Sequence, residues 1–179
     1  TLKQALAAQL GQSPFLDIFP EDRVRDTLKF MNRSPDERVT RELAKEICER
    51  QGFKAMLLGS ISALGNHYVV SLDAANAHTG ETLASEQFET DGKEQVLKSL
   101  GQAASRLREK LGESLGSIKK FDVPIEQVTT SSLEALRYYS MGREQHSSGK
   151  YADAIPFYRR AVELDPYFAI AHARLAVVY

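Results

Sequence analysis

The chain has 179 residues, 42% hydrophobic and 26% charged, a balance typical of a folded protein with one ordinary domain or two small ones. Its 23 basic and 24 acidic side chains give a net charge of -1, which argues against non-specific binding of nucleic acid or anionic membranes. The single cysteine, Cys48, excludes an internal disulfide framework, and no apolar run reaches the roughly 18 residues that a membrane span requires.

The amino-terminal segment predicts a helix, a strand and a second helix. Leucines recur every fourth residue over positions 2–10, which indicates a short amphipathic helix. The apolar run Phe15–Phe19, followed by a proline, predicts a strand. Glu21–Met31 then predicts a helix with Val24 and Leu28 facing inward.

A strong helix-start pattern follows at Ser34. Ser34, Pro35 and Glu37 match a capping residue, a first-turn proline and the returning carboxylate of a capping box, so we expect a helix from there to about Arg50. Cys48 lies on its inward face, which favours a packed thiol over a nucleophile. The other residues expected on or beside this face are Val39, Leu43, Ala44 and Ile47.

An extended pattern replaces the helical one after residue 54. Three segments, at 55–64, 68–72 and 82–88, are separated by Gly-Asn and Thr-Gly turn signals and predict an antiparallel meander. Apolar residues then recur at spacings of three and four over 96–111, which predicts a helix. We therefore expect an α/β or α+β domain at 1–116, with a mixed sheet covered by helices.

The remainder of the chain divides into a connector and a helical repeat. Residues 117–132 are rich in Ser, Thr and Lys without steady periodicity, which predicts an ordered connector. Residues 133–179 fit the tetratricopeptide pattern of two antiparallel helices, with one full repeat at 135–168 and the first helix of the next repeat after it. The residues that fit this pattern, and that we expect to serve packing, are Tyr138, Met141, Gly142, Gly149, Tyr151, Ala154, Tyr158, Ala161 and Pro166.

One face of the first repeat helix is the candidate binding surface. In arrays of this kind the first helices line a concave groove, here Leu136, Tyr139, Arg143 and His146; the alternative is an ordinary solvated or packed face. Tyr139 and Arg143 occupy the positions where some repeat proteins carry a Lys-Asn carboxylate clamp, so the sequence does not support that clamp. The pattern predicts a protein or peptide partner.

The segment Lys119–Gly142, with Ser34–Arg38 and Leu58–Ile61, resembles the carboxy-terminal region of a group of large bacterial serine/threonine protein kinases. The resemblance implies a kinase domain, a membrane helix, a small domain similar to the amino-terminal domain of the TolB family, and then tetratricopeptide repeats. It also implies that a first strand precedes Thr1. This chain would then be the region after the membrane helix, on the periplasmic or the cytoplasmic side, acting in signal transduction as a scaffold or sensor.

No catalytic, cofactor or metal site is predicted for the chain itself. It has no glycine-rich nucleotide loop and no kinase catalytic motif, so phosphoryl transfer cannot reside in these residues. Its histidines lack metal-ligand spacing, and Asp73, His78 and Glu81 fit solvated turn residues better than an acid–base group. The sequence thus favours a non-catalytic protein-interaction or sensor region; the alternative is a small-molecule sensor that regulates an upstream kinase. The oligomeric state stays open.

Overall fold

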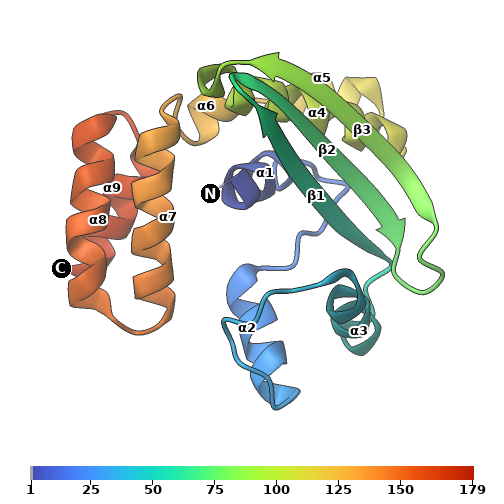
Figure 1. Cartoon of the computed structure of the whole chain (residues 1–179), viewed down its shortest axis with the longest axis horizontal. Helices are drawn as coiled ribbons and strands as arrows, with labels where there is room; N and C mark the ends of the chain where they lie inside the picture. Colours follow the sequence, from blue (N-terminus) through green and yellow to red (C-terminus); the bar gives the residue numbers. More distant parts are fainter. Residues whose placement is uncertain (1) are drawn as a thin grey trace.

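A computed structural model describes residues 2–179 and shows an antiparallel sheet with helices against it, followed by helical hairpins (Figure 1). This architecture confirms the expected fold class. The strands are β1 (Ala55–Leu64), β2 (His67–Asn76) and β3 (Thr82–Asp91). The helices are α1 (Leu2–Leu10), α2 (Glu21–Phe30), α3 (Arg41–Gln51), α4 (Val96–Lys110), α5 (Leu115–Phe121), α6 (Ile125–Val128), α7 (Leu133–Ser147), α8 (Tyr151–Leu164) and α9 (Ala169–Val178), with a short 3-10 turn at Lys93–Gln95 before α4.

The sheet has the strand order β1-β2-β3, and α4 packs against its β2 and β3 strands. Val70 and Leu72 of β2 are only 3% and 2% exposed. They belong to the same hydrophobic cluster as Leu97 and Leu100 on the apolar stripe of α4. Ile61 of β1 lies directly opposite Val70 and so shares its face, yet it is 47% exposed. The main core is therefore built on two of the three strands.

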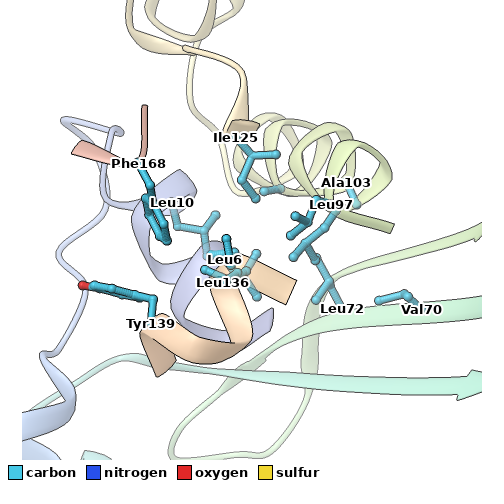
Figure 2. Packing of buried hydrophobic residues seen from close by; sticks show 14 of the residues in the cluster. Leu6, Leu10, Val70, Leu72, Leu97, Ala103, Ile125, Leu136, Tyr139 and Phe168 are labelled. Carbon is cyan, nitrogen blue, oxygen red and sulfur yellow. The ribbon is translucent and has the colours of Figure 1, made fainter. Parts of the chain in front are cut away.

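The main hydrophobic core continues from the sheet through α1 into the helical repeat (Figure 2). Leu6 and Leu10 of α1 belong to the same buried cluster as Leu136 and Tyr139 of α7 and as Phe168. The Ser140 hydroxyl on α7 also donates a hydrogen bond to Gln4 Oε1 on α1, at 2.6 Å. Figure 1 shows α1 between the sheet and α7. The first repeat is thus packed against the α/β part.

Two sequence predictions in the amino-terminal region are wrong. Phe15–Phe19 forms no strand, because the Ser13 hydroxyl accepts hydrogen bonds from the amides of Phe15 and Leu16 and folds the chain into a turn. The helix predicted from Ser34 begins instead at Arg41, where the Thr40 side chain accepts a hydrogen bond from the backbone N–H of Leu43.

The residues expected to cap a helix at Ser34 have other partners. The Glu37 carboxylate accepts a hydrogen bond from Arg33 at 2.8 Å instead of returning to the backbone of Ser34. Val39 therefore precedes the helix and is 39% exposed rather than inward. Cys48 is on the inward face as predicted, and burial raises the pKa of its thiol, which keeps it protonated and unreactive.

Helix α8 contains Pro156 deeper than the first turn. The helix begins at Tyr151, so Pro156 is its sixth residue and the carbonyl of Ala152 loses the amide that would normally bond to it. A proline is normally tolerated only in the first turn of a helix, where its missing amide has no intrahelical partner. In the structure the helix continues through Pro156 to Leu164, because its inward residues are fixed by packing against α7.

A buried ion network joins α4 to the segment after it. The guanidinium of Arg108 makes two hydrogen bonds of 2.8 Å to the Glu113 carboxylate, and both side chains are 1% exposed or less. Arg108 also bonds to Asp122 at 2.9 Å. Hydroxyl groups of Ser13 and Ser117 donate to the same Glu113 carboxylate, at 2.5 and 2.7 Å. The network therefore ties α4 and α5 to the turn after α1.

We expect the stability of the protein to fall at acid pH because of the Glu113 carboxylate. The hydrogen bonds from Arg108 hold the pKa of Glu113 at about 2, against an unperturbed 4.5, although burial opposes this shift. Because the folded-state pKa is the lower one, the stabilisation is present above pH 4.5 and is lost as the pH falls toward 2. Denaturant titrations at stepped pH should show a loss of about 3 kcal/mol from this group over that range.

Two glutamine variants separate the contribution of Glu113 to the unfolding free energy from general acid denaturation. Glu113→Gln removes the titrating group, so its unfolding free energy should fall less steeply between pH 4.5 and 2. Glu163→Gln removes a glutamate whose side chain is 54% exposed and, among residues 2–179, pairs with Arg160 alone, so it should keep the wild-type slope. Equal slopes in both variants and the wild type would show that Glu113 does not carry the effect.

Candidate functional site

Helices α7 and α8 form a hairpin whose contact depends on small side chains. Gly142 on α7 lies so close to Tyr158 on α8 that an added Cβ would be 2.7 Å from ring atoms Cδ1 and Cε1. Ala154 and Ala161 on α8 are 0% exposed, so the helices meet at these positions. The turn between the helices uses Gly149 at φ +76°, a left-handed conformation that glycine adopts readily.

The remaining positions of the repeat pattern lie at the edge of the hairpin. Tyr138 packs against the main core, Met141 is half-buried, and Pro166 follows the end of α8. Tyr151 is 54% exposed, although the pattern predicts packing for it as for the other aromatic residues. Its ring meets the ring of His146 edge-on, with centroids 5.1 Å apart. Part of the Tyr151 ring is therefore accessible to a partner.

The structure divides the four candidate groove residues into two pairs. Leu136 and Tyr139 are 1% and 5% exposed and belong to the main core together with α1. The Tyr139 ring also packs against Phe168, at 5.1 Å between centroids. Arg143 and His146, one and two turns further along α7, line an open cavity. In this arrangement only the second pair can reach a partner.

The cavity has a volume of about 570 Å³ and lies between α2, the end of α7 and the following turn, and α9. Its charged lining is mixed. Arg25 is held by Asp36 and by the Ser147 hydroxyl, each at 2.6 Å. The lining residues are Asp22, Arg25, Asp26, Lys29, Pro35, Asp36, Arg143, His146, Ser147, Ser148, Gly149, Tyr151 and Arg174.

Two arginines of the cavity are loosely held. Arg143 approaches Asp22 at 3.6 Å, which is longer than a charge-assisted hydrogen bond. Arg174 on α9 makes no hydrogen bond or ion pair within residues 2–179. Burial lowers the pKa of His146, and the positive charges of Arg174 and Arg143 lower it further. The His146 imidazole is therefore neutral at neutral pH and leaves the arginines as the cationic groups of this wall.

The described part of the chain contains no group of three or more His, Cys, Asp or Glu side chains placed to hold a metal ion. Nor does it contain a helix that is both long and apolar enough to cross a membrane. Asp73 accepts a hydrogen bond from Ser85 at 2.6 Å, and Glu81 accepts one from Thr79 at 3.2 Å. Over residues 2–179 neither carboxylate is hydrogen-bonded to His78.

Residues 135–168 match the family model for the tetratricopeptide repeat, which confirms the full repeat expected from the spacing. No curated protein matches the chain. Among solved structures, the chain is similar to the LpoB C-terminal domain from Salmonella enterica, with 20% sequence identity and a TM-score of 0.37. The match covers 41% of this chain and spans 55% of that chain. The tetratricopeptide repeat supports protein–protein interaction.

Proposed function

We propose that the chain is a non-catalytic protein-interaction region that receives a polypeptide partner at the accessible part of its first repeat. The main support is the repeat match over 135–168, combined with an open cavity at the end of α7. Repeat proteins present the inner face of their first helices to partners. Because Leu136 and Tyr139 are buried in the main core, the docking surface is the part bounded by Arg143, His146 and α9.

A bulky substitution in the cavity tests this proposal whatever the chemistry of the partner. Ser148 lines the cavity and is exposed, so Ser148→Trp should block the surface while leaving the core intact. Ser62→Trp places the same ring on an exposed position of β1, away from the cavity, and serves as the matched control. In quantitative affinity enrichment, we expect proteins that the wild type and Ser62→Trp retain and Ser148→Trp loses. Identical profiles for all three would contradict docking at this surface.

The sequence resemblance supports a more specific proposal about the parent protein. Lys119–Gly142 resembles the region that follows the membrane helix in large bacterial serine/threonine protein kinases. On this proposal a kinase domain and a membrane helix belong to the same polypeptide, and the chain acts as its scaffold. Kinase motifs and an apolar span in the complete gene would support this, whereas a complete gene that lacks both would remove it.

The division of the chain into 1–116, 117–132 and 133–179 also stays a proposal. The expected connector contains α5 and α6, and Ile125 of α6 is 1% exposed in the main core. A Cβ on Gly101 of α4 would be 3.1 Å from Ile125 Cγ2, so α6 packs closely on α4. These contacts support a connector that is fixed against the α/β part and positions the repeat.

The alternative function is a small-molecule sensor. A cavity of about 570 Å³ lies within the size range of small-molecule sites, although its lining is charged rather than apolar. A ligand that binds only the folded state would raise the melting temperature by mass action, so a thermal-shift screen against metabolites separates the two functions. A specific metabolite that shifts wild type and Ser62→Trp but not Ser148→Trp would favour the sensor.

A further inference from the structure

The cavity at the end of α7 has an unbalanced positive charge. Arg25 is paired with Asp36 at 2.6 Å, and Lys29 with Asp26 at 3.1 Å, so these four charges offset one another. The charged groups that remain in the lining are Asp22, Arg143 and Arg174. The Asp22 carboxylate therefore opposes the guanidinium groups of both Arg143 and Arg174. Its distance to the Arg143 guanidinium is 3.6 Å.

We propose that the cavity binds an acidic segment of a partner polypeptide, with a side-chain carboxylate seated between Arg143 and Arg174. This rests on the proposed function, because it names the chemistry of the partner at the same surface. A guanidinium presents parallel N–H donors that match the two oxygens of a carboxylate. Arg174 has no competing partner within the part of the chain that the structure describes.

The rest of the lining favours a short acidic segment over a polyanion. Asp22, whose carboxylate lies 3.6 Å from Arg143, stands on the α2 side of the same cavity and repels a long run of phosphates laid across it. The half-exposed ring of Tyr151 offers an apolar surface beside the arginines, which suits a side chain that flanks the acidic residue. The site therefore fits a short acidic segment that seats one Asp or Glu side chain at the two arginines.

His146 provides an internal reporter of carboxylate binding. An anion placed beside Arg143 and Arg174 offsets the positive charges that hold the pKa of His146 down, so binding should raise that pKa. By linkage, the acidic segment should bind more tightly as the pH falls through the pKa of His146. The groups that face His146 are Arg143 on its own helix, Asp22 on α2, Tyr151 and Tyr158 on α8, and Arg174 on α9.

Titration with a blocked hexaglutamate peptide at low salt, followed by NMR, tests the proposal. We expect amide shifts at the end of α7 and in α9, an increase in the pKa of His146, and about tenfold weaker binding to Arg174→Glu. Arg106→Glu reverses an exposed charge on α4, and Arg106 makes no hydrogen bond or ion pair within residues 2–179, so this control should bind as the wild type does. A blocked hexalysine peptide should give no shifts at this site.

Two results would overturn the proposal: equal hexaglutamate affinity for wild type and Arg174→Glu, or shifts centred away from α7 and α9. Circular dichroism of each variant verifies the fold, and Arg174→Gln, which removes the charge without reversing it, replaces Arg174→Glu if that variant unfolds. Failure of the acidic chemistry and failure of the proposed function give different results. If hexaglutamate fails while Ser148→Trp still loses partners, docking stands and only the acidic chemistry is rejected; if Ser148→Trp loses no partner, docking itself is rejected.

Discussion

Replacing Arg108 with alanine should destabilise the protein by about 3–5 kcal/mol, because it leaves a buried carboxylate without its counter-charge. Glu113 is 4% exposed and receives two hydrogen bonds from Arg108, and the serine hydroxyls that also donate to it cannot neutralise its charge. Asp122 loses its guanidinium partner as well. Urea denaturation at neutral pH, followed by circular dichroism, measures the loss of unfolding free energy.

A second arginine in the same helix provides the control for this prediction. Arg106 is exposed and forms no hydrogen bond or ion pair within the described residues, so Arg106→Ala should change the unfolding free energy by no more than about 0.5 kcal/mol. Arg108→Ala and the wild type should differ less in unfolding free energy at a pH low enough to protonate Glu113, because the buried charge is then absent from both proteins. A loss below about 1 kcal/mol in Arg108→Ala at neutral pH would contradict a structural role for the network.

Gly142→Ala should destabilise the repeat by about 1–3 kcal/mol, although alanine is the better helix former by about 1 kcal/mol. The new methyl group would lie 2.7 Å from two ring carbons of Tyr158, whose side chain is fully buried and cannot swing away. The helices of the hairpin would have to separate, which disturbs the contact of Tyr139 with Phe168. Thermal and urea unfolding measure the change.

Gly116→Ala is the matched control because Gly116 is also helical. Within the described residues, the nearest atom to an added Cβ there would be Ser114 Oγ, at 4.0 Å, so alanine should be neutral or stabilising by up to about 1 kcal/mol. We therefore expect Gly142→Ala to lower the unfolding free energy and Gly116→Ala to leave it unchanged or raise it. A stable Gly142→Ala protein would mean that α7 and α8 do not approach as closely as their contact distances indicate.

Strong periodic patterns predicted most elements of this fold. The leucines of α1, the meander and the apolar stripe of α4 each have one dominant period, and the structure places helices and strands there. Local signals were less reliable at Ser34 and at Phe15–Phe19. A capping pattern at Ser34 was outcompeted by the Thr40 cap, and the Ser13 hydroxyl folded the apolar run into a turn. Which of two neighbouring caps or turns forms depends on tertiary contacts, and a short stretch of sequence does not contain them.

The candidate site was only partly accessible to sequence reasoning. The repeat register placed Leu136, Tyr139, Arg143 and His146 on one face, but it contained no information that the first two would be buried in a core shared with α1. The buried charge of Arg108 did carry a signal, since it lies four residues after the inward Ala104 and interrupts an apolar stripe. The cavity could not be predicted from the sequence, because its walls come from α2 and α9, which lie far apart along the chain.

The most direct test of protein docking at the end of α7 is site-specific photo-crosslinking in cells. A benzoylphenylalanine replaces either Tyr151, which is 54% exposed in the cavity, or Tyr167, which is 93% exposed in the turn after α8. We expect a discrete protein adduct from position 151 that disappears when Ser148→Trp is added, and none from the more exposed position 167. A crosslinking yield that depends on exposure alone would be higher at position 167 than at position 151 and unchanged by Ser148→Trp. That result would contradict a docking surface at the end of α7.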